Sequence, residues 1–336
     1  MYRSIDELAD GVRNGNRRDL SKAITLIEST RTSDRDASAE LLDLLLPDTG
    51  GSIRVAITGL PGVGKSSFIE SLGTHLVESG KRVAVLSIDP SSQITGGSIL
   101  GDKTRMAELS RLPDAFIRPT PAGTVLGGVA ARTRETVWLC EAAGFDITLI
   151  ETVGVGQSEV SAHGLADLFL LMLLPAAGDE LQGVKRGVLE YVDMLLVSKA
   201  DGDLRDAALS TASDYQAALR LLRSNERDRF PDGVPVRTVS SKLNQGIAEA
   251  AEALVDHWQK MSADGTLQRK RTQQRSAWIE QQLQDELHTI LSADESVASR
   301  IAELKKLALQ GELSPRSFTD KISKEFKVVS IENRTS

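Results

Sequence analysis

The segment Gly59–Ser66, with the sequence GLPGVGKS, matches the phosphate-binding pattern G-x-x-x-x-G-K-[ST]. It follows the β-rich run Ile53–Thr58 and precedes an amphipathic stretch, which is the strand–loop–helix context that the pattern requires. Glycines let such a loop wrap with its backbone N–H groups pointing inward, while the following helix presents its positive end to the phosphates. The segment predicts a nest for a nucleoside triphosphate. The alternative, a glycine turn with a chance lysine, is disfavoured by the flanking strand.

Within this loop, Lys65 is predicted to reach the β- and γ-phosphates, and the Ser66 hydroxyl is predicted to bind Mg²⁺. Lys65 and the metal would neutralise charge on these phosphates while an aligned water attacks the γ-phosphorus. The predicted nucleotide-binding residues of the loop are Gly59, Pro61, Gly62, Val63, Gly64, Lys65, Ser66 and Ser67.

Hydrophobic periodicity predicts three regions. From residue 53 onward, short apolar runs alternate with amphipathic stretches, which favours an α/β three-layer sandwich with a mainly parallel sheet covered by helices on both faces. The predicted strands are Ile53–Thr58, Val83–Ile88, Ile147–Ile150, Leu168–Leu174, Met194–Val197 and Val236–Val239. Residues 1–50 have helical spacing, and after Trp258 an apolar stripe begins at Ile279 at helical spacing. We therefore expect an N-terminal helical extension (1–50), a nucleotide-binding domain (51–262) and a C-terminal helical arm (263–336).

Composition narrows the classes of function. Forty Lys and Arg against 47 Asp and Glu give 336 residues a net charge of −7, which argues against a nucleic-acid footprint or an anionic-membrane patch. The single cysteine, Cys140, excludes a disulfide framework and is expected in the core. The N-terminus has no apolar signal region, and the longest apolar run, Leu165–Pro175, is too short to span a bilayer. We expect a cytoplasmic protein that acts on a protein partner or small molecule.

Carboxylates at the ends of predicted strands are candidate metal ligands, because open α/β sheets bind ligands at the carboxyl ends of their strands. Asp89 follows one strand and Glu151 follows another, although either side chain could be a simple charged cap. The Gly154 amide can approach the γ-phosphate closely because no side chain intervenes. Asp102, in a glycine-rich segment, could join the metal shell, or that segment could be an ordinary surface loop.

A base-binding loop is predicted after the strand that ends at Val197. Ser198-Lys199-Ala200-Asp201 stands where GTPases generally carry N-K-x-D. The Asp201 carboxylate can accept two hydrogen bonds from guanine, whereas adenine lacks that donor pair, so GTP is favoured. Ser198 departs from the pattern, because its hydroxyl cannot make the paired bonds of an Asn amide to base and P-loop; weaker binding or relaxed base choice follows. The loop Ser240-Ser241-Lys242 could complete the pocket, and a solvated Lys–Asp turn is the alternative for the whole loop.

Seven segments together resemble a known family: the GTPases that act as chaperones of adenosylcobalamin-dependent acyl-CoA mutases such as methylmalonyl-CoA mutase, the MeaB, MMAA or ArgK-type proteins. The likeness covers about residues 50–260. Its segments are GLPGVGKS, VLSIDPSS, GGSILGDKTRM, RPTPAGTVLGGVA, ETVGVGQSE, PAAGDELQGVKRG and SKADGD.

The resemblance implies a signal-recognition-particle/MinD-like P-loop domain, a movable segment at Ala177–Gly187, and dimerisation through the C-terminal helices. It also implies Mg²⁺ contacts by Ser66, Asp89, Asp102 and Glu151. The implied partners are a homodimer mate, a B12-dependent acyl-CoA mutase and its adenosyltransferase, with GTP hydrolysis gating cofactor loading or the exchange of inactivated cofactor. The sequence itself shows no cobalamin site on this chain.

Intrinsic hydrolysis is expected to be slow and partner-stimulated, because Val155 follows Gly154 where small signalling GTPases place a glutamine. Glu151, Gly154 and Lys65 are the predicted catalytic residues, and Lys185 or Arg186 could add transition-state charge unless they are simple surface bases. Three alternative functions remain: a P-loop kinase, a nickel-type metallochaperone GTPase and a non-hydrolysing scaffold. The metallochaperone generally needs a cluster of Cys and His residues to deliver the metal, which one cysteine and four dispersed histidines do not provide.

Overall fold

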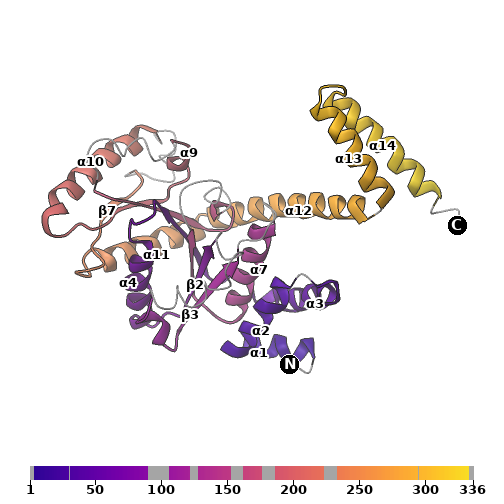
Figure 1. Cartoon of the computed structure of the whole chain (residues 1–336). Coiled ribbons are helices and arrows are strands. Elements are labelled where there is room, and N and C mark those ends of the chain that lie inside the picture. Colours follow the sequence, from indigo (N-terminus) through magenta and orange to yellow (C-terminus); the bar gives the residue numbers. More distant parts are fainter. Residues whose placement is uncertain are drawn as a thin grey trace. The chain divides into compact units, whose positions relative to one another are not determined.

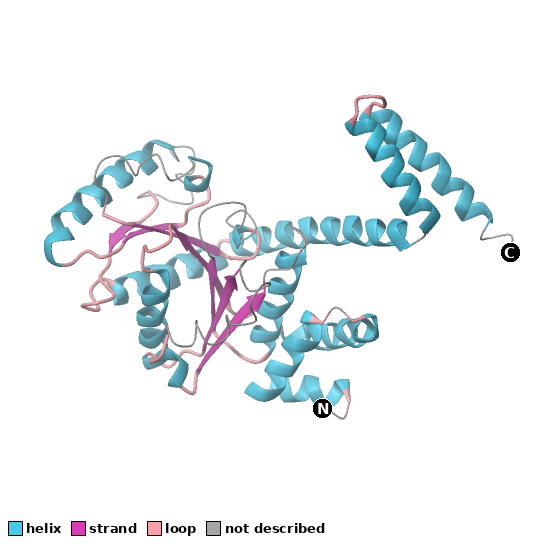
Figure 2. Cartoon of the chain, viewed as in Figure 1, coloured by secondary structure: helices cyan, strands magenta, loops and turns pink. Residues whose placement is uncertain are grey.

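The computed structural model of the chain describes residues 4–29, 31–89, 106–121, 128–152, 162–175, 186–222, 233–293 and 295–332. Contacts divide the chain into two compact units, Met1–Gln274 and Arg275–Ser336. The first unit contains the whole β-sheet, drawn in magenta in Figure 2. None of the helices in the described ranges combines the length and the apolar character needed to cross a membrane.

Within the described ranges, the sheet has seven parallel strands in the order β3-β2-β4-β1-β5-β6-β7. Figure 1 labels β2, β3 and β7. Their bounds are β1 Ile53–Gly59, β2 Val83–Asp89, β3 Ala115–Pro121, β4 Ile147–Thr152, β5 Leu168–Leu173, β6 Met194–Val197 and β7 Val236–Thr238. The predicted parallel α/β fold is confirmed. Strand β3 was not predicted, because Arg118, Pro119 and Pro121 interrupt its apolar run. Proline is tolerated there because, among the strands that the structure describes, β3 pairs only with β2 and forms an edge of the sheet.

Helices cover both faces of the sheet. Successive residues of a strand point to opposite sides, so each buried strand contributes side chains to two cores. Val55 and Ile57 of β1 join a core with the helices α4 (Lys65–Glu78) and α11 (Ile247–Ala263). Ala56 joins a core on the other face with α9 (Arg186–Leu189) and α10 (Arg205–Leu222). The helix α7 (Gly128–Ala142) packs on that second face beside β2 and β4 and carries Cys140, which is buried as expected. The result is the predicted three-layer sandwich.

The N-terminal extension is helical, as predicted. It forms α1 (Ile5–Arg13), α2 (Arg17–Glu28) and α3 (Arg35–Leu45), whose buried leucines share one core with α7. Ser4 caps α1 by accepting a hydrogen bond from the Glu7 amide at 3.1 Å. This small bundle therefore packs on the sheet through α7.

The C-terminal region is helical too. Helix α12 (Thr266–Ala293) begins in the first unit and continues into the second, where α13 (Glu295–Leu309) and α14 (Pro315–Glu332) pack on each other. Within the second unit, the stripe side chains Ile279, Leu283, Leu287 and Ile290 are 59, 54, 48 and 50% exposed.

Candidate nucleotide site

The phosphate loop joins β1 to α4 in the predicted geometry. Gly62 and Gly64 have φ angles of 78° and 96°, a left-handed backbone that glycine adopts at least cost. Gly59 ends β1 beside β5, and a Cβ atom there would lie 2.4 Å from the Met172 carbonyl oxygen. The first glycine of the motif is thus required by its contact with the neighbouring strand as well as by the turn.

Lys65 opens α4 and is 8% exposed. Its Nζ donates to the carbonyl oxygens of Gly59 at 2.7 Å and Leu60 at 3.2 Å, so the ammonium lies inside the curve of the loop. Burial lowers the pKa of Lys65 below its ordinary value, while the charge of Glu151 acts in the opposite sense. A cation held at this position suits phosphate oxygens.

The Glu151 carboxylate lies next to the phosphate loop. The Ser66 hydroxyl donates to its Oε1 at 2.8 Å, and the Ser87 hydroxyl on the neighbouring strand β2 donates to its Oε2 at 3.2 Å. Glu151 is 6% exposed, and the register pairs it with Ser87 across the two strands. Ser87 was not a predicted site residue. Its position two residues before Asp89 places it on the same strand as the predicted ligand, and only the strand register shows that it reaches Glu151.

The donor set fits a magnesium ion. A hydroxyl and a carboxylate within hydrogen-bond distance of each other are hard oxygen ligands of the kind that Mg²⁺ takes beside phosphate oxygens. Asp89 is the last residue of β2, the strand next to β4. Three predicted site residues, Asp102, Gly154 and Lys185, lie outside the described residues.

Ser198 connects the predicted base loop to the phosphate loop. Its buried hydroxyl donates to the Val63 carbonyl oxygen at 2.7 Å and contacts the Leu173 carbonyl oxygen at 3.0 Å. The serine therefore makes the P-loop half of the pair of bonds that we expected it to lose.

Asp201 lies beside the loop that follows β7. The buried Ser240 hydroxyl donates to its Oδ2 at 2.5 Å, and the Ala200 amide donates to the Val239 carbonyl oxygen at 3.1 Å. Lys199 has a φ of 53°, a left-handed conformation that is uncommon outside glycine. The two loops predicted to hold the base are thus joined at the carboxyl ends of β6 and β7.

A cavity of about 550 Å³ beside α4 contains further predicted residues. Ser67 lines it from α4, and Ser241 and Lys242 line it from the loop after β7. Glu70 and His75 face the same space. The phosphate loop, Glu151 and both base loops lie at the carboxyl ends of the parallel strands, where α/β folds bind their ligands.

Comparison with known proteins gives consistent matches. The family described as Methylmalonyl Co-A mutase-associated GTPase MeaB matches residues 20–296. A protein named a probable GTPase from Mycobacterium tuberculosis is 48% identical over 312 residues, covering 93% of this chain and 92% of that protein. The mouse protein named methylmalonic aciduria type A homolog, mitochondrial, is 42% identical and covers 97% of this chain and 80% of its own length. A crystal structure of a LAO/AO transport system kinase superimposes with a TM-score of 0.76 at 33% identity, covering 96% of this chain and 97% of that one.

Proposed function

This chain belongs to the MeaB family of GTPases, and from that membership we propose that it uses GTP hydrolysis to act as a chaperone of a B12-dependent acyl-CoA mutase. In this proposal the GTPase acts as a chaperone that gates adenosylcobalamin loading or the exchange of inactivated cofactor. The name of the family and the name of the mouse relative support a methylmalonyl-CoA mutase, or a mutase like it, as the client. Its adenosyltransferase is a second candidate partner.

The observation that carries the catalytic part is the contact of Ser66 with Glu151 at 2.8 Å beside the buried Lys65 ammonium. When bound, Mg²⁺ would supply positive charge at the phosphates, with Ser66, Glu151, Asp89 and Asp102 as its proposed protein ligands. Lys65 would bind the phosphate oxygens, exchanging its carbonyl partners for anionic ones. Ser87 would keep the Glu151 carboxylate oriented when Ser66 turns to the metal.

Guanine selection is assigned to Asp201. Ser240 donates to one carboxylate oxygen of Asp201, which limits the rotation of the side chain, and the remaining lone pairs of the carboxylate can accept both donors of guanine. Ser198 fixes the position of this loop against the phosphate loop. We therefore propose a preference for GTP over ATP.

The exposed stripe on α12 is assigned to a second copy of this chain. Ile279, Leu283, Leu287 and Ile290 are spaced by four, four and three residues, which places them along one face of the helix. A second copy carries the same stripe and can cover it symmetrically. Light scattering of the purified protein tests this part directly.

The test of the proposed function is hydrolysis of GTP and ATP with Mg²⁺, alone and with a panel of purified B12-dependent acyl-CoA mutases. We expect slow GTP-selective release of inorganic phosphate, faster with one mutase, lost in Lys65→Ala and less base-selective in Asp201→Ala. No response to any mutase would refute the client assignment and leave the GTPase intact. The relative of known structure is named a transport system kinase, which suggests a second candidate function, that of a phosphotransferase. Label from the γ-phosphate on an acceptor other than water would establish it.

A further inference from the structure

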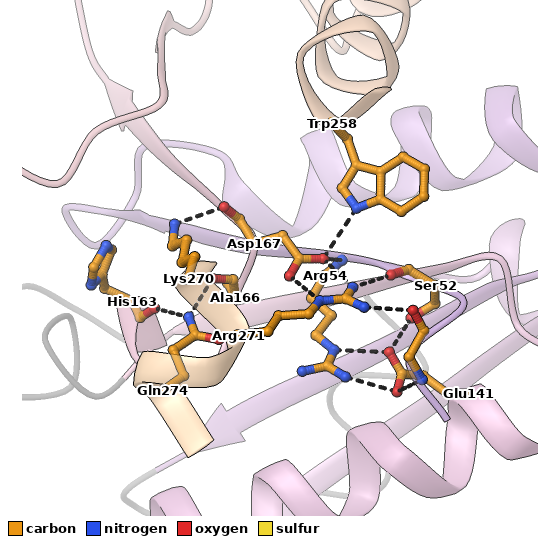
Figure 3. A network of polar contacts seen from close by, with 11 residues as sticks. Ser52, Arg54, Glu141, His163, Ala166, Asp167, Trp258, Lys270, Arg271 and Gln274 are labelled. Atoms are coloured by element: carbon orange, nitrogen blue, oxygen red, sulfur yellow. Dashed lines mark hydrogen bonds and ion pairs between the residues drawn. The ribbon is translucent and has the colours of Figure 1, made fainter. Parts of the chain in front are cut away.

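The first turns of α12 are hydrogen-bonded to residues at the amino ends of β1 and β5 (Figure 3). The nucleotide site lies at the carboxyl ends of the strands. Arg271 is the centre of this contact. Its guanidinium donates to the Asp167 carboxylate at 2.8 and 2.6 Å and to the carbonyl oxygens of Gly50 and Ser52 at 2.5 and 2.6 Å. One side chain therefore joins the segment that enters β1 to the residue that precedes β5.

Asp167 is fully buried and accepts further hydrogen bonds. The Arg54 amide on β1 and the Trp258 indole on α11 both donate to its Oδ2, at 3.0 and 3.3 Å. The Asp167 amide in turn donates to the Arg54 carbonyl oxygen at 2.8 Å. A buried carboxylate is stable only when it is paired and hydrogen-bonded in this way, so the position of Asp167 is closely defined.

The loop that leads into β5 is bonded through its backbone as well. Gln274 Nε2 donates to the carbonyl oxygens of His163 at 3.1 Å and Ala166 at 2.8 Å, and Lys270 Nζ donates to that of Asp167 at 2.7 Å. Arg134 of α7 donates to the Gly164 carbonyl oxygen at 2.8 Å. Side chains from α12 and α7 thus bind most of the carbonyl groups between His163 and Asp167.

The other end of β5 touches both halves of the nucleotide site. The Met172 carbonyl oxygen lies against Gly59, the first residue of the phosphate loop, where no side chain would fit. The Leu173 carbonyl oxygen accepts the Ser198 amide at 2.8 Å and contacts the Ser198 hydroxyl. Because β5 pairs with β1 along its length and is buried throughout, it forms a closely packed connection from Asp167 to Met172 and Leu173.

We propose that Lys270, Arg271 and Gln274 are positioning residues for the GTPase reaction. They hold β5 in the register that fits Gly59 and Ser198 around the nucleotide, so the root of α12 and the nucleotide site are energetically coupled. The coupling is reciprocal: nucleotide binding changes the stability of the contacts made by α12, and a partner that displaces this helix changes nucleotide affinity and turnover. This inference rests on the proposed assignment of the phosphate and base loops, and it adds that residues at the amino ends of the strands affect nucleotide binding and turnover.

Two neighbouring glutamines provide a matched test. Gln274 is half-buried and makes the two carbonyl bonds, whereas Gln273 on the same turn is exposed. Methionine has nearly the shape and helix propensity of glutamine without its donors, so Gln274→Met and Gln273→Met differ mainly in the lost bonds. The full chain carrying each change is compared with the parent for GTP kcat, GTP KM and GDP Kd, well below the melting temperatures of all three.

We expect kcat/KM to fall roughly fivefold in Gln274→Met, within the range seen for coupled positions remote from a ligand, and to stay unchanged in Gln273→Met. The second readout is Trp258 emission in a protein carrying Trp138→Phe and Trp278→Phe, since Trp258 donates to Asp167. Its emission should change on adding Mg²⁺ and GDP, and change less in Gln274→Met. Should Gln274→Met not fold, Gln274→Glu, which keeps the shape and repels the two carbonyls, replaces it against Gln273→Glu.

Equal kinetics and equal GDP affinity in the two methionine variants, with no response of Trp258 to nucleotide, would show that α12 serves only as a structural anchor. A lower melting temperature of Gln274→Met alone would not rescue the proposal. Lys65→Ala separates the two levels of inference: turnover that survives Lys65→Ala refutes the assigned nucleotide site itself, whatever the glutamine pair shows.

Discussion

Replacing Ser198 by alanine removes a single buried hydroxyl that links the base loop to the phosphate loop. The Ser198 hydroxyl is held at 2.7 Å from the Val63 carbonyl oxygen, while the backbone amide of Ser198 keeps its own bond to Leu173. Ser198→Ala therefore deletes the link between the loops and leaves the backbone path of the base loop in place.

The magnitude follows from the strength of one bond. A neutral intramolecular hydrogen bond contributes about 0.5–1.5 kcal/mol net. If this bond holds the loops in the arrangement that binds nucleotide, its loss weakens GDP binding by a factor of about 2 to 10. The same free energy lowers the melting temperature of a unit of this size by roughly 1–3 °C.

The assay is GDP affinity by calorimetry with Mg²⁺, together with thermal unfolding, for Ser198→Ala and for Ser213→Ala. Ser213 is an exposed serine on α10, so its change controls for the loss of a hydroxyl as such. A GDP affinity of Ser198→Ala equal to that of Ser213→Ala would refute the reasoning, because the link between the loops would then contribute nothing to binding.

Two further predictions concern the buried charges. Asp167→Leu leaves the Arg271 guanidinium buried without its carboxylate, which should lower the free energy of unfolding by about 3–5 kcal/mol. The control, Glu303→Gln, removes an exposed ion pair and should lower it by less than about 1 kcal/mol. Similar melting temperatures of the two variants would contradict this prediction. Burial raises the pKa of Glu135 from its ordinary 4.5 to about 7, so the folded state holds this proton more tightly than the unfolded state does. That stabilisation is complete below pH 4.5 and is lost as the pH rises to 7, and the free energy of unfolding falls by at most about 1.4 kcal/mol per pH unit. Unfolding curves of Glu135→Gln should lack this pH dependence. The same pH dependence in the variant and the parent would exclude Glu135 as its source.

Local patterns predicted the parts of the site that are built from contiguous residues. GLPGVGKS identified the phosphate loop with its flanking strand and helix, and Glu151 was found because it ends an apolar run. Both predictions needed only the chemistry of one segment and the rule that parallel strands bring their carboxyl ends together. The roles given to these residues stay predictions until nucleotide binding is measured.

Contacts between distant segments could not be predicted. Asp167 was visible as a lone acid inside an apolar run, but its partner Arg271 comes from a helix 104 residues further along the chain. Ser198 was expected to lose the bond to the phosphate loop because its side chain is short, but its hydroxyl lies 2.7 Å from the Val63 carbonyl oxygen. In each case the pairing depends on the packing of elements, which sequence periodicity does not specify.

The bonds of Arg271 bear on how this architecture can be recombined. A chain cut or spliced at residue 262, between the sheet and the arm as periodicity divides them, would lose Lys270, Arg271 and Gln274 and leave Asp167 buried without a cation. Arms from other proteins can therefore be grafted onto this GTPase unit only behind Gln274. The first turns of α12, as far as Gln274, must stay with the GTPase unit, and only the remainder of the helix is free to change.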